Sequence, residues 1–324
     1  MKILALDGIA AEGIAFLEEQ GFSVERRESL TEAELVRVLP PFAGLLVRSA
    51  TKVTAAALEK AVNLQVIGRA GVGVDNIDLE AASRFGVQVV NAPNGNTLAA
   101  AEHTMALILS LARNLPQANS RLKQGHWDKK GLSGIELAGK VLSVFGLGRI
   151  GSTVAMRAQA FGMRVIGYDP YLCPERMEKI GVTPAGLEDA LRQADFVTVH
   201  LPLTAETRHL LGAKELSLLK PQARVINAAR GGIIDEDALY QALLAGRLAG
   251  AALDVFEQEP ATAHQLFTLD NVIVTPHLGA STKEAQSRSS LEVAQDLAGY
   301  LRGQAPVNPV NRPVPKMQNL KAAN

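Results

Sequence analysis

The 324-residue sequence has one cysteine, Cys173, and no excess of charge of either sign. A single cysteine excludes an intramolecular disulfide and is typical of a protein that stays in a reducing compartment. Lysine and arginine together number 33, as do aspartate and glutamate, so no overall field attracts the chain to nucleic acid or to an anionic membrane. We therefore expect any anion to be bound by a local cluster of basic residues.

The sequence also has no apolar run of the roughly 18 residues that a membrane span requires. Its most apolar stretch, residues 105–112, is preceded by Glu102 and His103 and followed by Arg113. At the N-terminus, Asp7 interrupts the apolar residues too early for a secretory signal. These observations predict a soluble, cytoplasmic protein, and the 47% of apolar residues are enough to bury substantial cores.

Short apolar runs alternate with amphipathic helical stretches over nearly the whole chain. This alternation is typical of α/β proteins, and we expect two doubly wound parallel-sheet (Rossmann-like) domains separated by a cleft. Helices are predicted at 31–39, where Thr31 and Glu34 form a capping box, and at 54–61, 97–111, 154–161 and 283–301. Strands are predicted at 3–6, 44–47, 65–67, 87–90, 140–145, 164–168, 196–199, 224–227, 249–253 and 272–274.

The polar loop at residues 91–96 separates two such series and is the natural hinge. A second crossing is expected near residues 281–283, because the last helix would otherwise extend an already complete second domain. The resulting prediction is an outer, substrate-binding domain formed by residues 1–95 and 284–324, and an inner domain formed by residues 96–283.

Residues 146–151 read Gly-Leu-Gly-Arg-Ile-Gly and fit the pattern G-x-G-x-x-G. The pattern alone is weak, but here an apolar strand precedes it, a helical stretch follows it, and a second strand ends in Asp169. This is the complete dinucleotide-binding fingerprint. Gly146 permits a tight turn, Gly148 lets the backbone approach a pyrophosphate, and Gly151 allows close packing of helix on strand. The amides at the helix N-terminus can then bind the anion.

Asp169 is expected to accept hydrogen bonds from the adenosine ribose hydroxyls. A carboxylate at this place repels a 2′-phosphate, and residues 168–171 contain no arginine that could bind one. The sequence therefore favours NAD over NADP, and the inner domain is the predicted NAD-binding domain.

A cation, an acid and an imidazole follow three successive strands of the second series. Arg230 follows the strand at 224–227, Glu259 lies after 249–253, and His277 follows 272–274. Each residue alone has a structural explanation: a strand-end ion pair, a solvated loop acid or a core histidine. Because open α/β sheets bind ligands at the carboxyl ends of their strands, the three together indicate one site.

Oxidation of a 2-hydroxy acid by hydride transfer requires these residue types. A base must take the hydroxyl proton, and histidine titrates nearest to neutral pH. A neighbouring carboxylate orients the imidazole and stabilises its protonated form, and a guanidinium binds the substrate carboxylate through two parallel hydrogen bonds. We therefore predict His277 as general acid/base, Glu259 as its partner and Arg230 as the carboxylate-binding residue.

Two arginines of the outer domain, Arg48 and Arg69, also follow apolar strands. They could bind a second anionic group of the substrate, such as a phosphate, and Asn94 offers amide donors from the hinge. The alternative is that both arginines pair with nearby acids, as many surface arginines do. We expect a phosphorylated 2-hydroxy acid as the substrate.

The chain resembles the D-2-hydroxyacid dehydrogenase family almost from end to end. The most similar segments are residues 47–54, 68–78, 91–96, 146–151, 227–235, 251–260 and 276–288. Within that family, the chain is most similar to the members that oxidise 3-phospho-D-glycerate to 3-phosphohydroxypyruvate, the first step of L-serine biosynthesis.

The resemblance implies catalytic roles for Arg230, Glu259 and His277. We expect no metal. The residues that it places around NAD, besides the three glycines, are Arg149, Ile150, Asp169, Ala228, Ala229, Arg230, Asp254, His277, Gly279 and Ala280. It also implies a homodimer formed through the long helix at 97–111 and the loop after it. Trp127 would then be an interface residue, and a buried core tryptophan is the alternative.

Two other functions remain open. A glyoxylate or hydroxypyruvate reductase would keep Arg230, Glu259 and His277 but would have no need of Arg48. A non-enzymatic, NAD-sensing protein of the corepressor type shares the fold and even these residues. The chain ends soon after the last predicted helix, so we expect no C-terminal regulatory domain such as longer family members carry.

Overall fold

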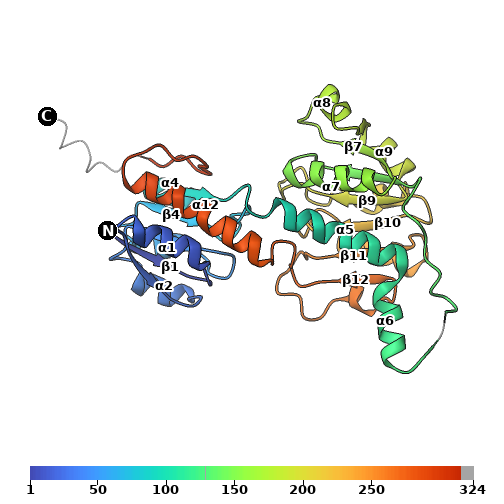
Figure 1. The fold of residues 1–324 in the computed structure, drawn as a ribbon, viewed down its shortest axis with the longest axis horizontal. Coiled ribbons are helices and arrows are strands. Elements are labelled where there is room, and N and C mark those ends of the chain that lie inside the picture. The colour runs from blue at the N-terminus through green and yellow to red at the C-terminus, as the bar shows by residue number, and fades with distance from the viewer. Residues whose placement is uncertain (128, 315–324) are drawn as a thin grey trace. The chain divides into compact units, whose positions relative to one another are not determined.

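The structure, a computed structural model, describes residues 1–127 and 129–314 (Figure 1). These residues form two compact units, each built around its own parallel sheet. Unit 1 consists of Met1–Asn96 together with the described residues from Ala280 onward, and unit 2 consists of Thr97–Gly279. Both ends of the chain therefore contribute to unit 1, whereas unit 2 is one continuous segment.

Unit 1 contains a five-stranded sheet in the order β2-β1-β3-β4-β5, and every neighbouring pair is parallel. Its strands are β1 (Lys2–Ala5), β2 (Ser23–Arg26), β3 (Gly44–Val47), β4 (Val66–Arg69) and β5 (Gln88–Asn91). Its helices are α1 (Ala11–Glu19), α2 (Glu32–Val38), α3 (Ala55–Lys60), α4 (Leu79–Arg84) and α12 (Lys283–Leu301).

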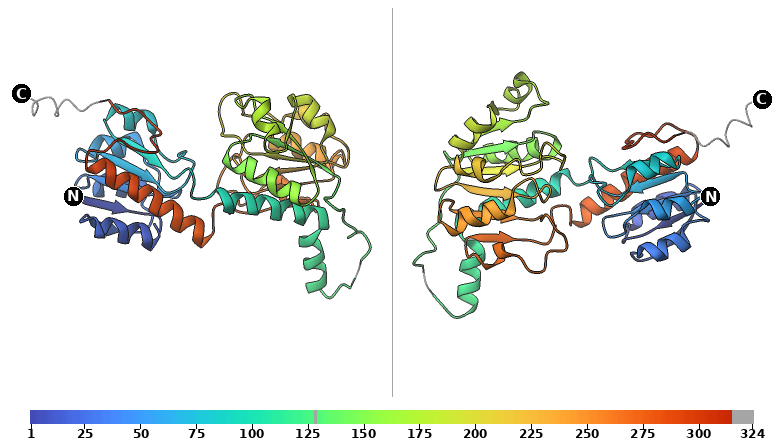
Figure 2. Two further views of the ribbon diagram at one scale, coloured as in Figure 1. Left: turned by 45° about the horizontal axis from the view of Figure 1, so that its top comes forward. Right: turned by 180° about the vertical axis from the view of Figure 1, so that it is seen from behind.

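Helices cover both faces of this sheet (Figure 2). Because successive residues of a strand point to opposite faces, neighbours in β1 enter different cores. Leu4 packs in one core with Leu35 of α2, whereas Ile3 packs in the other with Leu17 of α1 and Leu297 of α12. The strands that are buried on both faces account for the continuous apolar runs in the sequence.

Unit 2 contains a seven-stranded parallel sheet in the order β12-β11-β10-β9-β6-β7-β8. Its strands are β6 (Val141–Phe145), β7 (Arg164–Tyr168), β8 (Thr183–Pro184), β9 (Phe196–Val199), β10 (Arg224–Asn227), β11 (Gly250–Leu253) and β12 (Val272–Val274). Its helices are α5 (Thr97–Arg113), α6 (Leu115–Lys123), α7 (Arg149–Ala160), α8 (Pro174–Glu178), α9 (Leu187–Gln193), α10 (Ala213–Ser217), α11 (Glu236–Leu244) and the 3-10 helix η1 (Gln265–Thr268).

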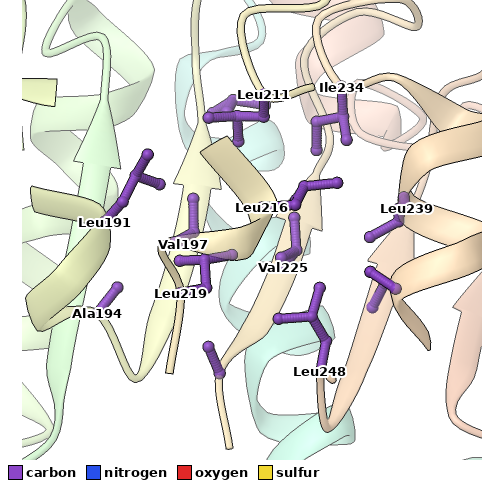
Figure 3. Packing of buried hydrophobic residues seen from close by; sticks show 14 of the residues in the cluster. Leu191, Ala194, Val197, Leu211, Leu216, Leu219, Val225, Ile234, Leu239 and Leu248 are labelled. Atoms are coloured by element: carbon purple, nitrogen blue, oxygen red, sulfur yellow. The ribbon is translucent and has the colours of Figure 1, made fainter. Parts of the chain in front are cut away.

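The same alternation produces two cores in unit 2. Val197 of β9 packs with Leu191 of α9 and Leu216 of α10 (Figure 3), whereas the adjacent Phe196 packs with Met105 on the face covered by α5 and α7. The predicted doubly wound fold is therefore confirmed in both units. The strand order reverses between β1 and β3 in unit 1 and between β6 and β9 in unit 2. Sheets of this type bind ligands outside the carboxyl ends of the strands at such points.

Two strands were not predicted from the sequence. β2 is an edge strand whose residues are largely exposed, so it carries no continuous apolar run. β8 is only two residues long and lies at the far edge of the second sheet. Edge strands that are short and polar give no periodic signal in a sequence.

The helices at the start of unit 2 differ in how much they bury. α5 buries nine of its residues, among them Met105 and Ile108, whereas α6 buries none. The side chain of Trp127, four residues beyond α6, is 82% exposed, so the alternative of a core tryptophan is wrong.

Across residues 1–127 and 129–314, no helix is long and apolar enough to cross a membrane.

Candidate active site

The predicted dinucleotide-binding turn connects β6 to α7. Gly146 has a φ of 90°, and a Cβ atom at this position would lie 2.7 Å from the main-chain oxygen of His200. A Cβ at Gly151 would lie 2.0 Å from the main-chain oxygen of Gly146. Both positions therefore require glycine, one for the turn and one for the close approach of helix and strand.

Gly148 meets a different condition. A Cβ at Gly148 would meet no atom of residues 1–127 and 129–314 within 4 Å, so the space in front of the backbone is open to that extent. Gly148 is the N-cap of α7 and provides no side-chain cap, and the helix begins with Arg149 and Ile150. The amides of this first turn can therefore donate to an anion that approaches the open side of the turn.

Asp169 is fixed beside the same turn, directly after β7. Its Oδ2 accepts a hydrogen bond of 2.9 Å from the Leu147 amide, and its Oδ1 accepts one of 3.0 Å from the Tyr171 amide. A carboxylate oxygen can accept two hydrogen bonds, so each oxygen retains capacity for a hydroxyl group. Asp169 is therefore a fixed carboxylate that can still accept hydrogen bonds from the hydroxyl groups of a ribose.

The strands that precede the three predicted catalytic residues are neighbours. β10, β11 and β12 are parallel, and Asn227 pairs with Leu253, which in turn pairs with Val274. Their carboxyl ends are therefore level with one another. The loops that leave them carry Arg230, Glu259 and His277, so all three loops start from the same edge of the unit 2 sheet.

His277 and Glu259 are in direct contact. Nδ1 of His277 lies 2.8 Å from Oε2 of Glu259, and Oε1 of Glu259 accepts a hydrogen bond of 3.1 Å from the Phe256 amide. Because a carboxylate can only accept, Nδ1 of the imidazole carries the hydrogen, and Nε2 of a neutral His277 is left with its lone pair. The His277 side chain is 47% exposed, so Nε2 is accessible to a substrate.

Glu259 is ionised at neutral pH. Burial raises the pKa of this carboxyl group, but the hydrogen bond and charge of His277 and the amide of Phe256 outweigh burial and hold the pKa below its usual range. An ionised Glu259 stabilises the imidazolium form of His277. The pair can therefore take up a proton at the imidazole and hold it.

The loop of Arg230 is held by Asn227 and approaches the loop of Glu259. The Asn227 side chain donates to the main-chain oxygen of Arg230 at 2.8 Å and accepts from the Ala229 amide at 3.0 Å. A Cβ at Gly231 would lie 1.9 Å from the main-chain oxygen of Phe256. Glycine at 231 thus allows the close approach of the two loops that carry the guanidinium and the acid.

The predicted substrate residues Arg48 and Arg69 lie at the carboxyl edge of the unit 1 sheet. Val47 of β3 pairs with Arg69, the last residue of β4, and Arg48 follows directly. The Arg48 amide donates to Oδ2 of Asp7 at 2.9 Å, whereas its guanidinium contacts only the main-chain oxygen of Asp7, at 3.5 Å. Within the part of the chain that the structure describes, Arg48 forms no ion pair with an acid.

Asn94, the third predicted substrate residue of unit 1, already has a partner. Its side-chain amide donates to Oε1 of Glu292 in α12 at 2.7 Å, and its main-chain amide lies 3.3 Å from Oε2 of the same residue. In this arrangement the donors of Asn94 are engaged within unit 1. A role in substrate binding requires an exchange of this bond and stays a prediction.

Residues 105–279 match the family model described as "D-isomer specific 2-hydroxyacid dehydrogenase, NAD binding domain". The chain belongs to this family. The matched segment lies within unit 2, so unit 2 is the NAD-binding domain of this D-2-hydroxyacid dehydrogenase family member, and the turn at residues 146–151 and Asp169 fit that cofactor.

Curated relatives include the D-3-phosphoglycerate dehydrogenase of Methanocaldococcus jannaschii, which is 52% identical over 97% of this chain and 60% of its own length. The human D-3-phosphoglycerate dehydrogenase is 48% identical over 96% of this chain and 58% of its own length. The family member described here thus spans about 60% of the length of these relatives.

Solved structures include the TT0316 protein from Thermus thermophilus, with 36% identity, a TM-score of 0.87 and coverage of 96% of this chain and all of that one. The D-lactate dehydrogenase from Aquifex aeolicus, complexed with NAD and lactic acid, has 30% identity and a TM-score of 0.84, and it covers 96% of this chain and all of its own.

Asp254 of this family member is fully buried behind the loop of His277. Its main-chain oxygen accepts from the His277 amide at 2.8 Å, and its carboxylate accepts from the amides of Leu278 and Gly279. The sequence-derived contact between Asp254 and the nicotinamide stays a prediction, as do the cofactor contacts of Ala228, Ala229 and Ala280. The structure adds a different role, in which Asp254 anchors the loop that carries the imidazole.

Two further titratable groups of unit 2, His200 and Glu236, were not identified from the sequence. Burial lowers the pKa of His200, which lies behind the glycine turn, to about 4. Burial also raises the pKa of Glu236 to about 7, and Oε1 of Glu236 accepts the Glu257 amide at 2.7 Å while Oε2 lies 3.1 Å from Nε2 of His264. A charged residue within a stretch of helix that faces the core is the signal that would have indicated Glu236.

Proposed function

We propose that this protein oxidises the D-2-hydroxy acid 3-phospho-D-glycerate to 3-phosphohydroxypyruvate with NAD, and thereby starts L-serine biosynthesis. The observation that carries the proposal is the 2.8 Å bond between His277 and Glu259, at the same sheet edge as the loop of Arg230. The relatives named D-3-phosphoglycerate dehydrogenase support the choice of substrate. The same proposal assigns NAD binding to residues 96–283 and substrate binding to residues 1–95 and 284–324.

The chemistry follows from the residues of unit 2. Oxidation of the secondary alcohol removes a proton from the hydroxyl group and a hydride from C2, and bound NAD supplies the hydride acceptor. Nε2 of His277 takes the hydroxyl proton, and the carboxylate of Glu259 stabilises the resulting imidazolium. The Arg230 guanidinium binds the substrate carboxylate and so fixes C2 relative to the base.

Unit 1 supplies positive charge for the phosphate. Arg48 follows β3 at the point where the strand order of the unit 1 sheet reverses, the place where such sheets bind ligands. Its guanidinium forms no ion pair with an acid among the described residues, so it retains donors for a phosphate. Arg69, at the end of the neighbouring strand β4, adds a second cation.

Purified protein assayed with NAD and a panel of D-2-hydroxy acids tests the proposal. We expect 3-phospho-D-glycerate to give the highest kcat/KM by NADH absorbance, above D-glycerate and D-lactate. The variant His277→Asn should lose hydride transfer by about 100-fold to 10,000-fold and should still bind NADH by fluorescence titration. Near-native turnover by His277→Asn would remove His277 as the base.

The same assay separates the two alternatives. Faster reduction of glyoxylate or hydroxypyruvate with NADH, insensitive to substitution of Arg48, would identify a reductase of unphosphorylated acids. Tight NADH binding without turnover of any acid of the panel would identify an NAD-sensing interaction protein.

We also propose that the protein is a homodimer formed through α5, α6 and the loop that follows. α6 buries none of its residues within the chain, and Leu115, Leu122 and Trp127 are 51%, 54% and 82% exposed. Apolar side chains that cluster on one exposed segment are typical of an interface. Light scattering should give twice the 34.4 kDa chain mass, and Leu122→Glu combined with Trp127→Lys should give the monomer.

A cytoplasmic location completes the proposal. The thiol of Cys173 is free and exposed, and a reducing compartment preserves an exposed thiol. Thiol-reactive labelling of Cys173 in intact and lysed cells checks this: labelling only by a membrane-permeant reagent in intact cells is expected, and labelling by an impermeant one contradicts it.

A further inference from the structure

One buried residue, Asp254, anchors the backbone of the loop that carries His277. The Asp254 carboxylate is fully buried, and it accepts the Leu278 amide at 2.7 Å on Oδ1 and the Gly279 amide at 2.8 Å on Oδ2. The main-chain oxygen of Asp254 accepts the His277 amide at 2.8 Å. Three consecutive amides, from His277 to Gly279, are thus bonded to a single residue.

This anchoring holds the backbone of His277 in a conformation that a residue with a Cβ atom rarely adopts. His277 has a φ of 55°, in the left-handed region that residues with a Cβ rarely occupy. Such a conformation persists only where the surroundings enforce it. The Asp254 carboxylate binds the two amides that directly follow His277, those of Leu278 and Gly279, so the direction of the imidazole depends on Asp254 remaining a carboxylate.

His103 of α5 completes the surroundings of this carboxylate. Nε2 of His103 lies 3.1 Å from Oδ1 of Asp254 and 3.2 Å from Oγ1 of Thr275, and Thr275 donates its hydroxyl to the same Oδ1 at 2.5 Å. Because Asp254 only accepts, Nε2 of His103 carries a hydrogen. His103 is therefore a donor, and in the protonated form a cation, facing a buried negative charge.

We propose that His103 is a positioning residue of the active site, which acts through Asp254 to hold the His277 loop in its catalytic geometry. The inference deepens the proposed function and rests on His277 being the base. His103 does not need to touch the substrate or NAD for this role. It supplies a donor, and a positive charge when protonated, to a carboxylate that is otherwise bonded mainly by backbone amides and one hydroxyl.

The electrostatics of Asp254 support the inference. Burial raises the pKa of Asp254, but the hydrogen bonds from His103, Thr275 and Leu278 and the charge of His103 outweigh burial and keep the pKa low. The negative charge of Asp254 in turn raises the pKa of Glu259, although the contacts of Glu259 with His277 and Phe256 outweigh this effect. His103 is thus a side-chain donor to the buried Asp254 carboxylate, and its removal should favour protonation of Asp254.

Selective isotope labelling gives a direct readout of this anchoring. The sequence contains three Leu-Gly pairs, at residues 147–148, 211–212 and 278–279. Protein labelled with carbonyl-13C leucine and 15N glycine therefore shows three filtered amide signals. Gly279 reports the bond to Asp254, Gly148 reports the dinucleotide-binding turn, and Gly212, the N-cap of α10, reports the general state of unit 2.

Four variants are compared with the wild-type protein in this assay. His103→Leu removes the donor. His103→Asn keeps a donor, but its side chain is too short to reach Asp254. His103→Gln retains a donor near the position of Nε2. Glu102→Gln, on the exposed neighbouring residue of α5, is the matched control. If His103→Leu fails to fold, which loss of the Gly148 and Gly212 signals would show, His103→Asn provides the same test.

We expect the Gly279 signal of His103→Leu and His103→Asn to titrate about one pH unit or more above that of the wild type, and its amide hydrogen to exchange at least about 10-fold faster. The kcat of both variants should fall by about 10-fold to 100-fold with a KM change below about 3-fold, and the acidic limb of the kcat profile should move to higher pH. His103→Gln should restore most of the loss, and Glu102→Gln should match the wild type.

An unchanged Gly279 titration and exchange rate in both His103→Leu and His103→Asn would overturn the role of His103, whatever the activity shows. Loss of kcat that His103→Gln does not rescue, with an unchanged Gly279 signal, would also overturn it. The proposed function is tested separately, because the wild-type protein alone shows whether Gly148 shifts on addition of NADH and whether a D-2-hydroxy acid is oxidised.

Discussion

His277 and Glu259 follow different strands, yet Nδ1 of the imidazole lies 2.8 Å from Oε2 of the carboxylate. The carboxylate is itself fixed, because its second oxygen accepts the amide of Phe256. The imidazole therefore has one nitrogen committed to an acid and the other available to a substrate. A histidine held in this way has a defined tautomer and a stabilised protonated form.

Replacing Glu259 by glutamine should therefore make His277 a weaker base but leave the imidazole in place. The amide no longer stabilises an imidazolium at His277, and it can present a donor to Nδ1 and so favour the wrong tautomer. We expect kcat at neutral pH to fall by about 100-fold or more, and the pKa seen on the acidic limb of the kcat profile to decrease. NADH binding, measured by fluorescence, should change little.

Glu257→Gln is the control for this prediction. Glu257 lies on the same loop, but Oε1 of its side chain is bonded to His209 at 2.9 Å. We expect its kcat to stay within about 3-fold of the wild type. A comparable loss in both variants would mean that the loop, and not the contact with His277, limits the reaction.

Asp169 should determine the preference for NAD over NADP. Its carboxylate is held beside the glycine turn by the amides of Leu147 and Tyr171, and it repels a 2′-phosphate. Asp169→Ser should lower kcat/KM for NAD by about 10-fold and raise it for NADP by a similar factor, since each factor of ten corresponds to about 1.4 kcal/mol. Steady-state kinetics with both cofactors would measure this, and an unaltered cofactor ratio would argue against the role.

Arg48 should discriminate the phosphorylated substrate from its unphosphorylated counterpart. Its guanidinium forms no ion pair with an acid among the described residues, so the loss of Arg48 leaves no acid without a partner. We expect Arg48→Ala to lower kcat/KM for 3-phospho-D-glycerate by about 100-fold or more and for D-glycerate by less than about 5-fold. Equal losses on both acids would show that Arg48 does not bind the phosphate.

The sequence predicted those parts of the fold that bury a continuous apolar run. β3, β7, β9, β10 and α12 have the predicted bounds, because strands covered on both faces and long amphipathic helices carry the strongest signals. The edge strand β12 also has its predicted bounds. The capping box of Thr31 and Glu34 at α2 is also confirmed. The exposed edge strand β2 was missed, since its charged residues pack against little.

The chemistry of the candidate site could be predicted from the sequence, but the residues that hold the His277 loop in place could not. Residues that end parallel strands converge by topology alone, so the neighbourhood of Glu259 and His277 could be inferred from strand order. His103 could not, because its partner Asp254 is far away in the sequence and a histidine on an apolar helix has no spacing that identifies it. Asn94 shows the opposite case: its loop suggested a free donor, whereas its amide is bonded to Glu292.

Two titratable groups, the partly buried His200 and the buried Glu236, should make the stability of unit 2 depend on pH in opposite directions. The pKa of His200 falls from 6.5 when unfolded to about 4 when folded, so the native state binds fewer protons and its stability increases as the pH rises across that range. The pKa of Glu236 rises from 4.5 to about 7, so the native state binds more protons and its stability decreases as the pH rises from 4.5 to 7. Each contribution is about 3 kcal/mol.

The two effects should largely cancel in the wild-type protein and separate in single variants. In His200→Gln only the Glu236 effect remains, and the free energy of unfolding, relative to the wild type, should decrease as the pH rises from 4.5 to 6.5. In Glu236→Gln only the His200 effect remains, so the relative free energy should increase over the same range. Urea unfolding followed by circular dichroism at several pH values would measure both slopes. Slopes of the same sign would contradict the assignment, because a base that is neutral when buried and an acid that is neutral when buried must respond to protons in opposite ways.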